Sequence, residues 1–145
     1  MRYRLVHINL RMKCAKQMIR EGHGGAIVTM SSISAYVGAV DQTVYCATKA
    51  GILMLSKALA LVLGEHSIRV NCILPGSIYT NMSSKHPGSE ARRFVEQKSS
   101  LKRMGDSSEI ASAVSFLLSD DASYTTSAEL LIDGGLLVNA EYNPN

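Results

Sequence analysis

Cysteine is scarce in this chain of 145 residues, which contains three cysteines and no Cys-x-x-Cys spacing. An odd number of widely spaced cysteines argues against a disulfide framework and against a zinc site. The simplest setting for free thiols is a reducing compartment. We therefore expect neither a metal centre nor a disulfide-stapled fold.

Runs of charge of one sign are missing as well. The net charge of +3 comes from scattered lysines and arginines, with no basic run and no interleaved aromatic residues. Nucleic acid is therefore not an expected partner. Low-complexity segments and repeats are absent too, and a composition of 46% hydrophobic and 19% charged residues is typical of one globular domain.

Long uninterrupted hydrophobic runs are also lacking. The first residues, MRYRLVHINLRMK, contain no apolar core followed by small residues, so they are not a secretory signal. The longest apolar stretch, residues 50–63, is interrupted by Ser56 and Lys57 and is too short to span a membrane. The sequence predicts a soluble, cytoplasmic protein without a membrane partner.

The stretch from Gly24 to Leu63 carries the candidate chemistry. It reads as an apolar strand at Ala26–Met30, a serine-rich turn, a glycine-containing loop and a long apolar helix that starts near Thr43. Tyr45 and Lys49 are four residues apart, so they lie on the same side of this helix. An ammonium beside a phenol stabilises the phenolate, which allows a tyrosine to exchange a proton with a substrate alcohol or carbonyl.

Serines end the strand, because Ser31, Ser32 and Ser34 compete for its backbone hydrogen bonds. Ser32 is placed to polarise the substrate oxygen that Tyr45 would protonate. At least one of the three serines is expected to be a turn residue only. For Tyr45 and Lys49 the alternative is an ordinary exposed pair on a helix.

The chain contains one Tyr-x-x-x-Lys motif, thirteen residues after the strand-end serine. This combination resembles the short-chain dehydrogenase/reductase family. The resemblance implies that Ser32 orients the substrate and that Tyr45 is the catalytic acid or base. It also implies that Lys49 activates Tyr45 and that both residues contact the nicotinamide ribose.

A second family motif, Pro-Gly-x-x-x-Thr, follows the strand expected at Ile68–Leu74. The resemblance implies that Pro75, Gly76, Ile78 and Thr80 bind a nicotinamide cofactor, with proline and glycine bringing the backbone close to the ligand. Either NAD or NADP fits this pattern, because the residues that discriminate them lie outside the matching part of the family.

Three polar residues complete the expected site. Asn9, in the segment HINLR, matches a family asparagine whose bound water relays protons to the lysine, although a helix-entry cap explains it equally well. Ser34 and Gln42 are the expected substrate contacts, and their polar side chains suit a polyol.

The rest of the chain repeats strand–helix–strand units. Asp106 and Glu109 predict a capping box before a helix at Ile110–Leu118, and a third strand is expected at Ala128–Ile132. Such repeats imply an α/β fold with a parallel, Rossmann-like doubly wound sheet.

The resemblance covers the second half of the family's domain. The N-terminal strands and the Gly-rich nucleotide turn, Thr-Gly-x-x-x-Gly-x-Gly, are missing from residues 1–145. We therefore expect a single, incomplete domain. Its strand Ala26–Met30 would form an apolar edge, and one face of the sheet would be uncovered.

The helix expected at Thr43–Leu63 is apolar nearly all round beyond Ala50, except at Ser56 and Lys57. A helix of this kind is buried on several sides. We expect it to form a homo-oligomer interface, as the family resemblance also implies; burial within one subunit is the alternative.

Two further segments, SSISAYVGAVDQTVY and LLIDGGLLVN, are similar to sugar 1-dehydrogenases of the L-rhamnose type. This likeness implies oxidation of an aldose at its anomeric carbon with NAD or NADP. A generic ketone or a 3-oxoacyl substrate is an alternative. The alternative to an enzyme is a catalytically silent chain that acts as an oligomerisation module.

Overall fold

The computed structural model describes residues 2–80 and 90–139, and the side chains of residues 12–80 and 92–138. A three-stranded parallel sheet lies at its centre, in the order β1-β2-β5. The strands are β1 (Gly25–Met30), β2 (Ile68–Pro75) and β5 (Glu129–Ile132). All three expected strands are thus confirmed. A further short parallel pair, β3 (Ile78–Tyr79) with β4 (Gly105–Asp106), is not predicted by the sequence.

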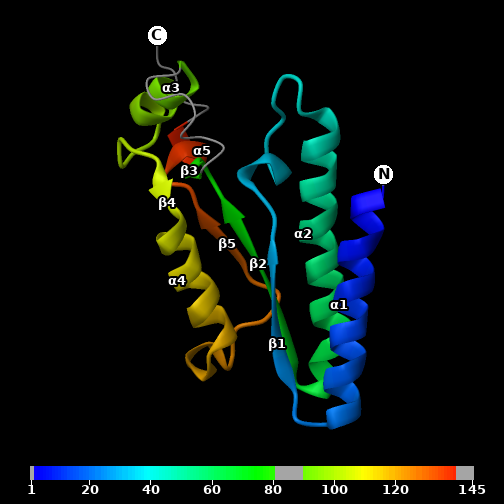
Figure 1. Cartoon of the computed structure of the whole chain (residues 1–145). Coiled ribbons are helices and arrows are strands. Elements are labelled where there is room, and N and C mark those ends of the chain that lie inside the picture. The colour runs from blue at the N-terminus through cyan, green and yellow to red at the C-terminus, as the bar shows by residue number, and fades with distance from the viewer. Residues whose placement is uncertain (1, 81–89, 140–145) are drawn as a thin grey trace.

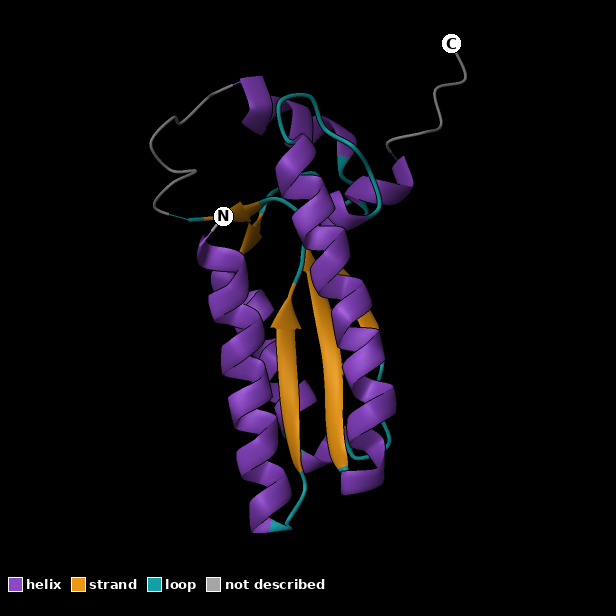
Figure 2. Ribbon diagram, turned by 90° about the vertical axis from the view of Figure 1, so that its right-hand side faces the viewer, coloured by secondary structure: helices purple, strands orange, loops and turns teal. Residues whose placement is uncertain are grey.

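Helices cover the sheet on both sides, with α1 and α2 on one face and α4 on the other (Figure 1). Their bounds are α1 (Arg2–Glu21), α2 (Thr43–Leu63), α3 (Glu90–Lys98), α4 (Ser107–Leu118) and α5 (Leu136–Asn139). Figure 2 shows α1 and α2 running side by side along the strands. The α/β doubly wound prediction is therefore confirmed.

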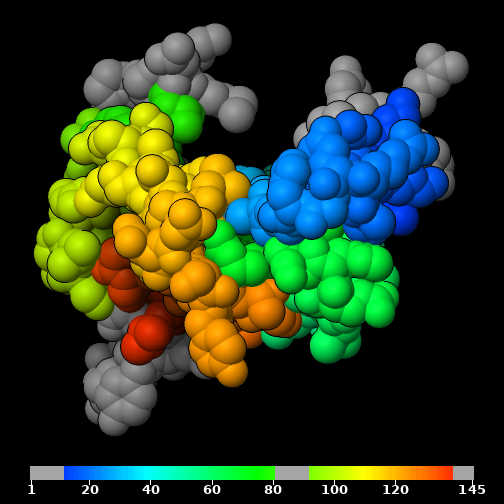
Figure 3. All heavy atoms as spheres, turned by 90° about the horizontal axis from the view of Figure 1, so that it is seen from below, coloured from blue at the N-terminus to red at the C-terminus, as the bar shows by residue number. Residues whose placement is uncertain are grey.

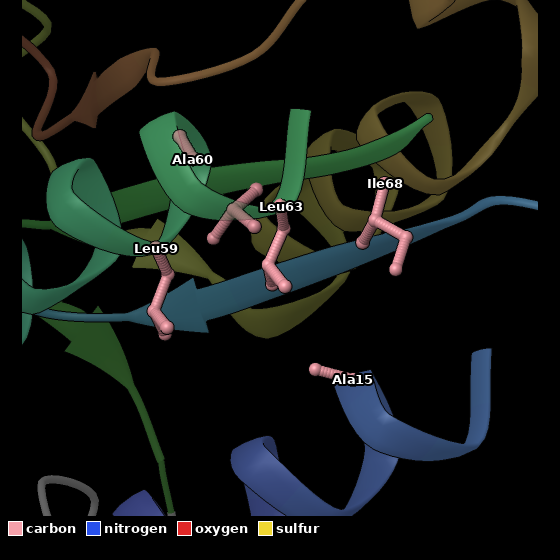
Figure 4. Close-up of a cluster of buried hydrophobic side chains, with 6 residues drawn as sticks. Ala15, Leu59, Ala60, Leu63 and Ile68 are labelled. Atoms are coloured by element: carbon pink, nitrogen blue, oxygen red, sulfur yellow. The ribbon is translucent and has the colours of Figure 1, made fainter. Parts of the chain in front are cut away.

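Strand β2 is the centre of the core because both of its faces are buried. Ile68 and Val70 pack with the α1 and α2 side chains, whereas Ile73 packs towards α4. The first of these clusters contains Ala15, Leu59, Ala60, Leu63, Ile68 and Val70 (Figure 4). Alternate β2 residues thus serve opposite layers, which explains why the strand reads as a continuous apolar run.

Strand β1 lies at the edge of the sheet, as expected. The expectation that one sheet face would be uncovered is wrong, however. Val28 packs in the cluster beneath α4, and Ile27 packs in the cluster beneath α1 and α2. Seen from below, α1 and α2 occupy one flank and α4 the other (Figure 3). The sheet lacks cover along the β1 edge rather than across a face.

Two helix ends differ from the sequence expectation. Helix α1 begins at Arg2, so Asn9 lies inside the helix and is not its entry cap. Its extension follows the helical spacing of Leu5, Ile8 and Met12. Gly64 directly after the expected helix predicts a glycine cap, but the chain continues through a 3-10 turn at Gly64–His66, and Ser67 adopts the left-handed conformation (φ 56°).

Within the part of the chain that the structure describes, one helix is long and apolar enough, by length and composition alone, to cross a membrane: Thr43–His66, with a mean hydropathy of 1.6. The expectation that this run is too short is therefore wrong, because Ser56 and Lys57 do not interrupt the helix. Such a test is weak, since core helices of soluble proteins also pass it. Here the helix packs on β2 through Leu59 and Leu63.

Candidate active site

A cleft of about 380 Å³ opens where β1 and β2 end. It is lined by Met30, Ser31, Ser32, Tyr45, Lys49, Pro75, Gly76, Ile78, Thr80, Ser107 and Ile110. The carboxyl ends of parallel strands are where open α/β sheets bind ligands. Position and lining together make this cleft the candidate active site.

All but three of the predicted site residues meet in this cleft. Ser34 and Gln42 do not line it, although both are described. Gln42 instead precedes α2 as an exposed N-terminal cap without a side-chain capping bond. Asn9 belongs to α1, but its side chain lies outside the described residues.

Four lining residues escaped the sequence reasoning. Met30 and Ser31 directly precede Ser32, so the end of the strand was a signal for both. Ser107 and Ile110 come from the first turns of α4, more than 25 residues after Thr80. Nothing local marks them, because only the packing of α4 on the sheet brings them to the cleft.

Tyr45 and Lys49 occupy the first two turns of α2 and lie on the same side, as predicted. The Lys49 ammonium nitrogen sits 5.4 Å from the centroid of the Tyr45 ring. The same nitrogen donates a hydrogen bond to the Met30 carbonyl at 3.3 Å. Tyr45 is 45% exposed, so a ligand in the cleft can reach its hydroxyl.

Ser32 begins the short 3-10 helix Ile33–Ala35. Its Oγ accepts a hydrogen bond from the Ser34 N–H at 3.2 Å and donates one to the Ser34 hydroxyl at 3.3 Å. Ser32 is only 8% exposed, yet it lines the cleft. Ser32 is therefore held in a fixed position by its turn and by its two hydrogen bonds to Ser34.

Gly76 is required by local packing, independently of the expected cofactor contact. A Cβ atom there would lie 2.6 Å from Cβ of Asp133, in the loop after β5, and the Gly76 N–H donates to the Ile132 carbonyl at 2.9 Å. Close packing of the loops after β2 and β5 thus explains this glycine without any ligand.

Ile78 is fixed by the short β3–β4 pair, whose register places it opposite Gly105. Arg103 supports the same corner, because its guanidinium donates two hydrogen bonds of 2.8 Å to Glu109. Glu109 in turn accepts the Asp106 N–H at 2.7 Å, which confirms the predicted capping box. The pKa of Glu109 is lowered to about 2, mainly by the hydrogen bonds from Arg103 and to a smaller extent by the bond from the Asp106 N–H.

A second polar cluster supports the loop after β1 from outside the cleft. Glu129 of β5 accepts a hydrogen bond from the Lys57 ammonium at 3.0 Å and also bonds the Tyr36 hydroxyl. Burial, followed by the bond to Glu129, raises the pKa of Tyr36 to about 12. The pKa of Glu129 is lowered, mainly by its hydrogen bond with Tyr36 and next by its hydrogen bond with Lys57.

The cleft fits one end of a nicotinamide cofactor. Lys49 and Thr80 offer an ammonium and a hydroxyl, and the loop at Pro75 and Gly76 offers backbone atoms beside them. A Gly-rich turn for the pyrophosphate is absent from the sequence. Within residues 2–80 and 90–139, no group of three or more His, Cys, Asp or Glu side chains could hold a metal ion.

The parallel sheet, with helices on both faces and a cleft at the carboxyl ends of its strands, defines a Rossmann-like α/β domain. The family model described as "Enoyl-(Acyl carrier protein) reductase" matches residues 5–137. The chain belongs to the short-chain dehydrogenase/reductase family.

Individual relatives agree with this assignment. The chain is 46% identical to L-rhamnose 1-dehydrogenase (NAD(P)(+)) of Sphingomonas sp. (strain SKA58), over 88% of this chain and 50% of the relative. It is 44% identical to L-rhamnose-1-dehydrogenase of Scheffersomyces stipitis, over 96% of this chain and 57% of the relative.

Among solved structures, 4-hydroxyisoleucine dehydrogenase complexed with NADH superposes with a TM-score of 0.87 at 29% identity, covering 91% of this chain and 55% of that one. The chain thus spans about half the length of the relatives it matches.

Proposed function

We propose that this chain is the catalytic half of an NAD(P)-dependent dehydrogenase that oxidises a sugar at its anomeric carbon. The observation that carries the proposal is the meeting of Ser32, Tyr45, Lys49 and Thr80 in one cleft at the ends of β1 and β2. The likeness to two L-rhamnose 1-dehydrogenases supports an aldose of the L-rhamnose type as the substrate.

Each residue has a distinct part in this proposal. Tyr45 takes the proton of the substrate hydroxyl during oxidation and returns it during reduction. Lys49, whose nitrogen is 5.4 Å from the Tyr45 ring centroid, stabilises the phenolate and binds the ribose hydroxyls. Ser32 hydrogen-bonds the reacting oxygen. A bound nicotinamide supplies the hydride acceptor.

The remaining site residues are assigned by the same proposal. Pro75, Gly76, Ile78 and Thr80 hold the nicotinamide end of NAD or NADP. Ser34 and Gln42 are proposed to contact the sugar, which requires the loop after β1 to close over the cleft. Asn9 is proposed to hold the proton-relay water that the family resemblance implies.

We also propose that residues 1–145 form one incomplete domain, the carboxyl-terminal half of the family's fold, in a cytoplasmic homo-oligomer. Support for the oligomer comes from α2, on which Val44, Met54, Leu61 and Val62 are exposed. Neither nucleic acid nor a membrane is a proposed partner.

Replacing Tyr45 by phenylalanine tests the catalytic assignment. We expect NAD(P)-dependent oxidation of L-rhamnose, followed by the absorbance of the reduced nicotinamide, to fall by about 10²–10⁴-fold, because the proton acceptor is lost. The circular dichroism spectrum should be unchanged. Tyr124→Phe, at a fully exposed tyrosine outside the cleft, is the matched control and should retain activity. Turnover retained in Tyr45→Phe would refute the assignment.

A second candidate function is that of a catalytically silent module that associates with full-length dehydrogenase subunits. The missing Gly-rich turn favours this alternative, because the phosphates then lack their usual cradle. It predicts no oxidation of L-rhamnose by the purified chain at any concentration, together with co-elution with a full-length relative.

A further inference from the structure

We infer that Ser31 is a positioning residue for Lys49, an inference that rests on the proposed function of that lysine. Ser31 precedes the serine that the family resemblance singles out, and its hydroxyl contacts the backbone of α2. Its Oγ donates a hydrogen bond of 2.8 Å to the carbonyl oxygen of Lys49.

Ser31 is itself held rigidly. Its N–H donates to the Ile73 carbonyl of β2 at 2.8 Å, which extends the ladder between β1 and β2 by one residue. Ile73 is fully buried in the core, and Ser31 is 2% exposed. The Ser31 hydroxyl is therefore a buried donor in a fixed position, and the loss of its acceptor would leave it unsatisfied.

A second hydrogen bond runs in the opposite direction between the same two places. The Lys49 ammonium donates to the carbonyl of Met30, the residue next to Ser31, at 3.3 Å. The end of β1 thus holds the backbone of Lys49, and Lys49 holds the backbone of β1. This reciprocal pair fixes where the ammonium sits relative to the Tyr45 ring.

The same strand and helix share another buried hydroxyl contact, which serves as a comparison. The Thr29 and Ser56 hydroxyls are 2.7 Å apart, and Ser56 donates to the Ile52 carbonyl at 2.7 Å. Ser56 is 1% exposed and lies two helical turns beyond Lys49. Loss of either serine removes a buried bond between β1 and α2, but only Ser31 touches Lys49.

The experiment compares the acetylation rate of Lys49 with that of Lys57 in the same folded sample, using acetic anhydride and mass spectrometry of digests. Lys57 lies on the same helix, paired with Glu129 at 3.0 Å, so it reports any general loosening of α2. In Ser31→Ala we expect the acetylation rate of Lys49, divided by that of Lys57, to rise about threefold. A change of this size corresponds to the net free energy of a single hydrogen bond.

The matched control Ser56→Ala should leave the ratio at its wild-type value. Ser31→Cys, which fills the same space with a weaker donor, should also raise the ratio and replaces Ser31→Ala if the alanine variant does not fold. An unchanged ratio in the Ser31 variants, or an equal rise in Ser56→Ala, would overturn the inference. Because labelling needs no turnover, a chain that fails to oxidise sugars would refute the proposed function separately.

Discussion

The pairing of Arg103 with Glu109 shows how single residues hold the segment that leads to the cleft. Both oxygens of Glu109 accept from the guanidinium at 2.8 Å, and one of them also accepts the Asp106 N–H. These bonds join the start of α4 to the turn before β4, which pairs with β3. The strand that leads to Thr80 is therefore held by an ion pair on the molecular surface.

The low pKa of Glu109 has a consequence for acid stability. A carboxyl whose pKa falls from 4.5 to about 2 on folding stabilises the fold above pH 4.5, and this contribution is lost as the pH falls towards 2. Glu109→Gln should therefore lower the Tm by about 1–3 °C near neutral pH, a small effect because the pair is exposed. The difference from wild type should shrink below pH 4.5.

Thermal melts of both chains from pH 7 to pH 2.5 measure this difference. Glu65→Gln, at an exposed glutamate far from the cleft, is the control and should change the Tm little across the range. A Tm difference that stays constant down to pH 2.5 would show that Glu109 acts through packing and not through its charge.

At the scale of elements, α2 has two different sides. Leu53, Leu59 and Leu63 are buried against the sheet, and Ser56 bonds Thr29. On the other side Leu61 is 84% exposed, with Met54 and Val62 nearby on the helix. An exposed apolar surface of this kind on a helix is typical of an interface between subunits.

A charge on this side of α2 tests the proposed oligomer. Leu61→Glu should convert the chain to monomers in size-exclusion chromatography with light scattering, because a carboxylate cannot be buried in an apolar contact without a partner. Val40→Glu, the same change at an exposed valine in the loop before α2, should leave the mass of wild type. A wild-type chain that elutes as a monodisperse monomer would contradict the proposal.

Much of this element structure follows from the sequence. β1, β2 and β5 are mainly apolar runs, so their formation as strands could be predicted. The i, i+4 spacing predicted that Tyr45 and Lys49 would share one side of α2. The β3–β4 pair could not be predicted, because two-residue strands have no periodicity and depend on Arg103 and Glu109 for their position.

The site was less predictable than the elements that carry it. Family motifs pointed to Ser32, Tyr45, Lys49 and Thr80, which do meet in the cleft. The three serines predict the end of β1, but the contact of Ser31 with Lys49 could not be predicted, because it joins residues 18 positions apart. Contacts of this length depend on the packing of α2 on β1 and leave no local pattern.

At the scale of the whole molecule, the described residues form a three-stranded sheet with helices on both faces and with β1 and β5 at its edges. Helices cover both faces of the sheet, whereas β1 has no neighbouring strand on its outer side within the described residues. The cleft lies at the end of this edge strand, where we propose that the nicotinamide end of a cofactor binds. The chain spans about half the length of its relatives and has no Gly-rich turn for the phosphates. We therefore expect this chain to bind whole NAD or NADP weakly.

The most direct test of the central claim is to titrate the ¹⁵N-labelled chain with NAD, NADP and nicotinamide mononucleotide and to follow the backbone amides by NMR. We predict shifts of the Lys49, Gly76 and Thr80 amides, alike for all three ligands, with dissociation constants near the millimolar range, about −4 kcal/mol. The nicotinamide end would then be bound without its phosphate cradle. Shifts confined to residues outside the cleft, or no shifts at saturating ligand, would contradict the account.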